Sequence, residues 1–188
     1  MKKIILASAS PRRHYLLKEL NIPFEVEVRA VDEVYPDGLK REEIALYLAK
    51  LKAAAFENQI AQNTLIITAD TIVWIDNKVL GKPLDTADAK RMLNILSGRM
   101  HEVITAVCLK SSDKEKLFFV ESKVWFKKLT DAEIDWYIER FKPFDKAGAY
   151  GVQEWLGYVG IERIEGSYFN IMGLPLKEVY EGVMSYEL

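Results

Sequence analysis

The sequence has few cysteines and no long apolar segments, features that several classes of protein require. Its single cysteine, Cys108, excludes an internal disulfide and lies in an apolar run where we expect a buried, inert thiol. No apolar run approaches the roughly 20 residues of a membrane-spanning helix. The first ten residues are too short, and too soon followed by Arg12 and Arg13, for a signal peptide. We therefore expect a soluble, cytoplasmic protein.

A large net charge of either sign is also absent. The sequence has 26 Lys and Arg residues and 28 Asp and Glu residues, so its formal net charge is −2. No global positive field therefore favours binding to a nucleic-acid backbone. Any recognition of phosphate must therefore be local. The 188 residues, 49% of them hydrophobic, are enough for one well-buried core, so we expect a single domain over residues 1–188.

Segments typical of strands and helices alternate in the first half of the chain, and long strands follow in the middle. The apolar runs KIILA (3–7) and TLIIT (64–68) predict buried strands, and the strict alternation of FEVEV (24–28) predicts a half-buried one. Longer strands are expected at 101–110 and 116–128, and helices at about 11–20, 41–60, 86–96, 131–141 and from 175 onward. This pattern predicts an α/β protein with a mixed sheet sandwiched by helices.

Three carboxylates are candidates for chemistry. Asp70 follows TLIIT, so we expect it where a buried strand ends, and ligands of open α/β sheets gather outside such ends. Asp32 or Glu33, in a predicted loop, could join Asp70 to supply the one or two carboxylates that Mg²⁺ needs. The simpler alternatives are that Asp70 closes a turn and that the loop is merely solvated.

The stretch LASASPRR (6–13) and two lysines are candidates for anion binding. Ser10 can cap the helix that Pro11 begins, but two arginines at a helix start oppose the macrodipole unless an anion is bound there. The unpaired N–H groups of such a helix end also favour an anion. Lys82 lies in a Gly-Lys-Pro loop and Lys52 in an alanine-rich helix, and each is also readable as an ordinary surface charge.

Two further segments carry polar side chains of interest. In GAYGVQ (148–153), small residues allow close backbone approach, and Gln153 offers a donor and an acceptor that could read the edge of a base. A plain turn with a solvated glutamine is the alternative. His101 could be a catalytic base, although a lone histidine at a strand start is more often structural.

Eight motifs then occur in a fixed order: LASASPRR, VDE (31–33), LAKLKA (48–53), TADTIV (68–73), GKP (81–83), SGRMHEVITAV (97–107), GAYGVQ and IEGSYFNIMGLPL (164–176). Together they closely resemble the Maf family of nucleoside triphosphate pyrophosphatases, once described as septum formation proteins. The resemblance covers essentially the whole chain. It implies a fold similar to that of the inosine triphosphate pyrophosphatases (Maf/Ham1-like) and suggests a homodimer.

The resemblance also implies a reaction and roles for residues. The reaction is hydrolysis of a nucleoside triphosphate to the monophosphate and pyrophosphate with a divalent cation, Mg²⁺ or in its place Mn²⁺ or Co²⁺. Asp70 matches the proton acceptor that activates the attacking water, and Glu33 matches an acidic residue that would serve the metal with Asp70. The positions that hold the phosphates correspond to Ser8, Arg13, Lys52 and Lys82.

Three positions that separate the subfamilies correspond to Arg12, Thr71 and Gln153, and their identities resemble the branch acting on dTTP and UTP rather than the one acting on 7-methyl-GTP. Modified pyrimidine triphosphates would suit the same pocket, and their removal would keep them out of nucleic acids. The stretch Glu154, Trp155 and Leu156 departs from that branch, which continues from the glutamine into a short glycine-containing turn. The shape of this loop stays open at this point.

Two alternatives have their own consequences. Asp70 could be a nucleophile that forms an aspartyl phosphate, as an Asp-Thr pair at a strand end can suggest. The chain could instead be a nucleotide-binding regulator of cell division with little catalysis. Such a regulator would bind nucleotide without releasing pyrophosphate, and it would have no need of a base near the phosphates.

Overall fold

The computed structural model, which describes residues 3–57 and 60–186, contains one mixed sheet. Its strands are β1 (Lys3–Leu6), β2 (Glu25–Val26), β3 (Thr64–Ile75), β4 (Lys78–Leu80), β5 (Met100–Lys110), β6 (Glu115–Phe126) and β7 (Ile161–Glu165). They are hydrogen-bonded in the order β2-β1-β3-β5-β6-β7, and β4 pairs with β3. β1 runs parallel to β2 and β3, whereas the β3–β4 and β6–β7 pairs are antiparallel. The predicted α/β class with a mixed sheet is confirmed.

Seven α-helices and a short 3₁₀ helix are described. They are α1 (Pro11–Glu19), α2 (Glu42–Ala54), α3 (Thr86–Leu96), α4 (Asp131–Phe141), η2 (Ala147–Ala149), α5 (Trp155–Gly160), α6 (Tyr168–Met172) and α7 (Leu176–Met184). No helix among the described residues is long and apolar enough to cross a membrane.

The chain divides into two compact units. Unit 1 comprises the described residues of Met1–Asp70, Thr105–Val120 and Gly173–Leu188, and unit 2 those of Thr71–Ile104 and Glu121–Met172. Three strands, β3, β5 and β6, contribute residues to both units. The single-domain interpretation of the sequence stays a prediction.

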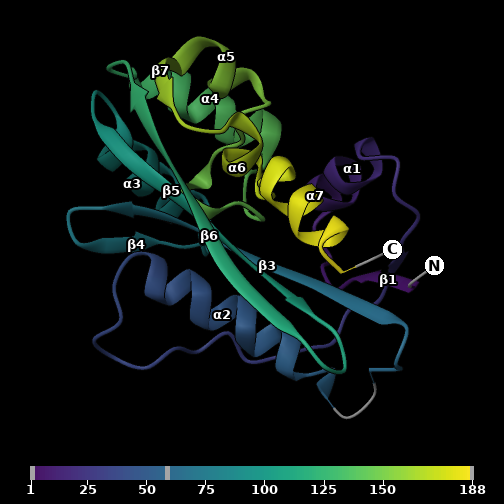
Figure 1. Cartoon of the computed structure of the whole chain (residues 1–188). Helices are drawn as coiled ribbons and strands as arrows, with labels where there is room; N and C mark the ends of the chain where they lie inside the picture. The colour runs from purple at the N-terminus through teal and green to yellow at the C-terminus, as the bar shows by residue number, and fades with distance from the viewer. Residues whose placement is uncertain (1–2, 58–59, 187–188) are drawn as a thin grey trace. The chain divides into compact units, whose positions relative to one another are not determined.

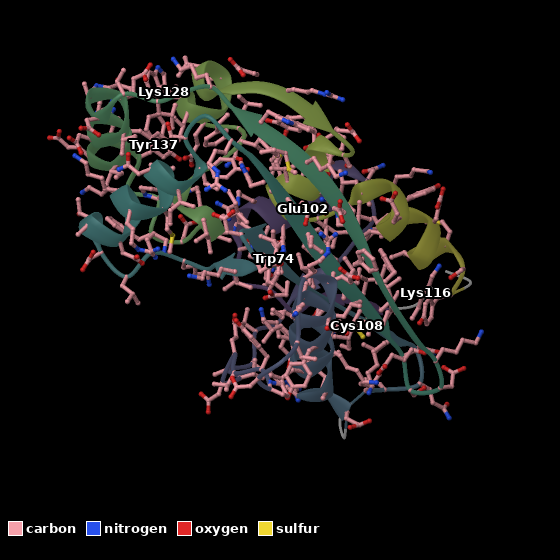
Figure 2. The ribbon with its side chains drawn as sticks, turned by 90° about the vertical axis from the view of Figure 1, so that its left-hand side faces the viewer. Trp74, Glu102, Cys108, Lys116, Lys128 and Tyr137 are labelled. Atoms are coloured by element: carbon pink, nitrogen blue, oxygen red, sulfur yellow. The ribbon has the colours of Figure 1, made fainter. Side chains whose placement is uncertain are left out.

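In unit 1, α2 lies on one side of the strands, and α1 and α7 lie on the other (Figure 1). α2 presents an apolar face that is buried, including Ile44, Leu48 and Ala53. On α7, a Cβ at Gly182 would lie 2.4 Å from Leu109 Cδ1, so this glycine allows the helix to pack closely on β5. Cys108, labelled on β5 in Figure 2, is buried, and this burial raises the pKa of its thiol to about 12. The expected inert thiol fits this position.

Turn and capping residues in the sequence account for three local features of unit 2. β3 and β4 form a hairpin, with Asp76 and Asn77 at φ values of 51° and 57°, as a tight two-residue turn requires. The side chain of Asp85 caps α3 by accepting a hydrogen bond from the Asp88 N–H. At α4, Thr130 and Glu133 form a reciprocal capping box.

Three local expectations differ from the structure. FEVEV forms only the two-residue strand β2 at the end of the strand order, and both Glu25 and Val26 are exposed. α2 ends at Ala54, and residues 58–59 of its expected last turn lie outside the described residues. The Ser10 side chain makes no capping hydrogen bond to α1; instead, the Ser10 N–H donates to Ser8 Oγ at 3.3 Å.

Candidate functional site

Asp70 lies inside a strand and not at its end. β3 continues through Ile75, because the residues after Asp70 are again apolar, and Asp70 is only 7% exposed. The sequence expectation of a strand end was therefore wrong in this detail. A carboxylate at such a position requires a polar partner, since the burial of an unpaired charge is costly.

The partner comes from α2, and Thr68 aligns the two elements. Its hydroxyl donates to the Ala49 carbonyl oxygen of α2 at 2.7 Å. Thr68 and Asp70 share one face of β3, because side chains alternate along a strand. Ala49 and Lys52 are three residues apart and so share one face of α2. Lys52 Nζ consequently reaches Asp70 Oδ1 at 2.5 Å.

Glu33 joins the same lysine from the loop between β2 and α2. Its Oε1 lies 3.1 Å from Lys52 Nζ, and the side chains of Glu33, Lys52 and Asp70 are 48%, 16% and 10% exposed. Asp32, the other acidic candidate, is exposed. The structure thus brings together three predicted site residues, with one ammonium between two carboxylates.

Arg29 ties this loop to the end of α2, and sequence reasoning missed it. Its Nη1 donates to the Ala55 carbonyl oxygen at 2.8 Å, and its guanidinium carbon lies 4.1 Å from the centre of the Phe56 ring. Nε and Nη2 both donate to Glu27 Oε1. A cation beside the carbonyl groups that end a helix is favourable, but no sequence signal links residue 29 to residue 55.

Ser8 and Arg13 are brought together at the start of α1. Arg13 donates to Gly173 O at 2.8 Å, to Ala69 O at 2.9 Å and to Ser8 Oγ at 3.4 Å. Burial lowers the pKa of Arg13, while the carboxylates of Asp70 and Glu33 oppose this shift. Arg13 therefore lies in the field of both acids.

His14 and Arg12 complete this helix start. His14 Nε2 donates to the Ser8 carbonyl oxygen at 2.5 Å, which fixes the strand-to-helix turn. Arg12 is half-buried on the first turn of α1, and its charge also lowers the pKa of Arg13.

The remaining candidates belong to unit 2. Thr71 follows Asp70 in β3 and so faces the opposite side of the sheet. Lys82 is exposed in the loop after β4. The Gly81 carbonyl oxygen in that loop accepts the Gly148 N–H at 3.0 Å, which joins the GKP loop to the GAYGVQ segment. Oε1 of Gln153 is buried and has no hydrogen-bond partner among the described residues.

His101 has the features of a structural residue. Its Nε2 lies 2.7 Å from the Tyr150 hydroxyl, and its ring packs edge-on against Phe126 and Tyr150. It is 1% exposed, and burial lowers its pKa to about 3, so the imidazole is neutral near pH 7. A proton-accepting role in catalysis does not fit this position.

The donor set near Lys52 fits a divalent cation that arrives with phosphate. Within residues 3–57 and 60–186, no cluster of three or more His, Cys, Asp or Glu side chains forms a ready metal cage. Glu33 and Asp70, both within 3.1 Å of Lys52 Nζ, supply two carboxylates. Mg²⁺ commonly takes one or two carboxylates and completes its shell with water and substrate phosphate.

Similar sequences cover nearly the whole chain. A dTTP/UTP pyrophosphatase of Phocaeicola vulgatus is 54% identical over 179 residues, which span 95% of this chain and 93% of that protein. One of Christiangramia forsetii is 51% identical over 95% of this chain and 91% of its own length. One of Porphyromonas gingivalis is 49% identical over 98% and 94%, respectively.

Two solved structures resemble the chain more weakly. The Ham1 protein of Staphylococcus aureus is 16% identical with a TM-score of 0.47 over 66% of this chain and 72% of that chain. A nucleoside-triphosphatase, dITP/XTP pyrophosphatase, of Mycobacterium abscessus is also 16% identical, with a TM-score of 0.42 over 98% and 94%. Structural matches with such low TM-scores do not support a fold assignment, so the fold class rests on the sheet described above.

The family of this chain follows from a match that spans nearly its whole length. A model of the family described as Maf-like protein matches residues 3–185, nearly the whole sequence. The relatives above, about half identical along almost their full length, agree with it. The chain therefore belongs to the Maf family.

Proposed function

We propose that this protein hydrolyses dTTP and UTP to the nucleoside monophosphate and pyrophosphate. The observation that carries the proposal is the mostly buried Asp70 carboxylate held by Lys52, in a chain about 51% identical to dTTP/UTP pyrophosphatases over 95% of its length. A carboxylate aimed by a fixed ammonium is suited to accept a proton from water.

The four charged side chains at this site can bind a chain of phosphates only when further cations are present. Arg13 and Lys52 balance Asp70 and Glu33, so this quartet is neutral. A triphosphate brings roughly four more negative charges near neutral pH. We assign Ser8, Arg13 and Lys52 to binding its phosphate oxygens, and we assign Lys82 to the same task on the family resemblance alone.

Asp70 is assigned as the general base. Lys52 holds its Oδ1, which orients the carboxylate, and we assign Oδ2 as the atom that accepts the proton of the attacking water. The water attacks the α-phosphorus, the bond to the bridging oxygen breaks, and pyrophosphate leaves. A positioned general base typically contributes about 10²–10⁴-fold in rate.

Glu33 and Asp70 would hold the divalent cation. When bound, Mg²⁺ would supply positive charge that stabilises the phosphate oxygens as charge develops on the leaving group. Recognition of the nucleobase is assigned to Arg12, Thr71 and Gln153 by the family resemblance. Modified pyrimidine triphosphates are candidate substrates for the same residues.

A substrate panel tests the proposal. The purified protein would be incubated with Mg²⁺ and with UTP, dTTP, CTP, ATP or GTP, and both pyrophosphate and the nucleotide product would be measured. We expect UTP and dTTP to give the highest kcat/KM, with equal amounts of monophosphate and pyrophosphate. A preference for purines, or release of inorganic phosphate in place of pyrophosphate, contradicts it.

Location and assembly follow as parts of the same proposal. Nucleoside triphosphates are metabolites of the cytoplasm, so we place the activity there. The family resemblance favours a homodimer. Light scattering on the purified protein should give about twice the mass of the 21.6 kDa chain, and a monomer mass would contradict this assignment.

A further inference from the structure

The loop that carries Gln153 is held at both ends by one hydroxyl group. Tyr137 of α4, labelled in Figure 2, is fully buried. Its hydroxyl donates to Glu154 Oε2 at 2.5 Å and accepts the Gly151 N–H at 3.0 Å. Because Gly151 and Glu154 lie on either side of Gln153, this single oxygen fixes the backbone before and after it.

A second group restrains Glu154 itself. Its other carboxylate oxygen lies 3.1 Å from Lys146 Nζ, and the two side chains are 18% and 9% exposed. The backbone that follows is packed tightly, because a Cβ at Gly157 would lie 1.9 Å from the Val152 carbonyl oxygen. The stretch that follows Gln153 is therefore anchored by its contacts with Tyr137 and Lys146.

Gln153 is restrained in its own backbone as well. The Tyr158 hydroxyl donates to the Gln153 carbonyl oxygen. The side-chain Oε1 is buried and accepts no hydrogen bond from the described residues. A buried acceptor without a donor is costly unless a ligand supplies one.

The chemistry of the bases explains why such restraint matters. Uracil and thymine present an N3–H donor beside the O4 acceptor, whereas cytosine presents an N3 acceptor beside an amino donor. A primary amide carries an acceptor and two donors, so an amide that turns freely pairs with either pattern. Discrimination by a glutamine is therefore only as good as the fixation of its orientation.

We infer that Tyr137 and Glu154 are positioning residues for substrate choice, which fix the backbone on either side of Gln153 and so place its buried Oε1 to accept the N3–H of a uracil or thymine base. The inference rests on the proposed hydrolysis of dTTP and UTP. It assigns to two residues outside the family's specificity positions the ability to set the ratio of UTP to CTP hydrolysis.

The test compares kcat/KM for UTP and for CTP in matched variants. Tyr137→Phe removes only the hydroxyl, and Glu154→Ala removes its partner, whereas Glu154→Gln retains an acceptor for Tyr137. We expect the first two variants to lower the UTP to CTP ratio by about tenfold or more, as the loss of an aligned hydrogen bond predicts. Glu154→Gln should keep a ratio within about threefold of wild type.

Tyr186→Phe is the control for stability alone. The Tyr186 hydroxyl also makes a buried hydrogen bond, to the Leu109 carbonyl oxygen at 2.8 Å, but in unit 1. All assays would be run well below the lowest melting temperature. Equal losses for both substrates in Tyr137→Phe and Glu154→Ala, or an unchanged ratio, would overturn the positioning role.

Assays of the wild-type protein distinguish failure of the proposed function from failure of the positioning role. Failure of the wild type to hydrolyse UTP contradicts the proposed function and, with it, this inference. Hydrolysis of UTP by the wild type, with a ratio that the variants leave unchanged, contradicts the positioning role alone. If Tyr137→Phe does not fold, the comparison of Glu154→Ala with Glu154→Gln carries the test, and an equal ratio in the two variants would overturn it.

Discussion

Replacement of Lys52 by methionine would leave two carboxylates without their shared cation. Lys52 Nζ and Asp70 Oδ1 are 2.5 Å apart, with side chains only 16% and 10% exposed. Opposite charges about 4 Å apart attract by about 4 kcal/mol at an effective dielectric constant of 20, and desolvation of both ions offsets much of this. We therefore expect Lys52→Met to lower the free energy of unfolding by about 2–4 kcal/mol.

A double-mutant cycle in urea separates the ion pair from other effects of the substitution. Unfolding would be followed for wild type, Lys52→Met, Asp70→Asn and the double variant. The double variant should lose about 2 kcal/mol less than the sum of the single losses, because its neutral amide no longer needs the cation. Lys50→Met, on the same helix, removes a more exposed pair with Glu115 and should cost less than about 1 kcal/mol. Additivity within about 0.5 kcal/mol would refute the coupling of Lys52 to Asp70.

Three further predictions concern other parts of the chain. His101 has a pKa of about 3 in the folded state against about 6.5 in the unfolded state, so the unfolded state takes up the proton first. The free energy of unfolding should therefore fall as the pH drops from 6.5 toward 3, by up to about 1.4 kcal/mol per pH unit. His101→Phe should flatten this slope in urea titrations between pH 6 and 4, and an unchanged slope would count against the prediction. Thr130→Ala removes a helix cap and should cost about 1 kcal/mol in thermal unfolding, so no change would show that the cap is energetically silent. Arg29→Gln should loosen the loop of Glu33 and lower kcat/KM for UTP about tenfold, while the exposed Arg163→Gln leaves it unchanged; equal effects of the two would contradict the role of Arg29.

Elements governed by local chemistry could be predicted from the sequence. The limits of α3 and α4 follow from capping residues and apolar periodicity, and the β3–β4 turn follows from Asp76 and Asn77, which tolerate positive φ. In each case the residues that decide the structure lie within a few positions of one another.

Features that depend on distant partners could not be predicted in this way. Asp70 looks like the end of a strand because a carboxylate usually ends an apolar run, and only Lys52 of α2 explains why the strand continues. FEVEV has the alternation of a half-buried strand, but burial depends on what packs against it, and β2 lies exposed at the end of the strand order. The links from Arg29 to Ala55 and from Tyr137 to Glu154 likewise join segments that no local pattern connects.

In the proposed reaction, water attacks the α-phosphorus of a pyrimidine nucleoside triphosphate, with Asp70 as its base. Hydrolysis of UTP under single-turnover conditions in ¹⁸O-labelled water tests this claim most directly. We predict one labelled oxygen in UMP and none in pyrophosphate, with turnover nearly abolished in a folded Asp70→Asn variant. An unlabelled UMP in the first turnover, as an aspartyl intermediate cleaved by water at its carbonyl carbon would give, or label in the pyrophosphate, would contradict it.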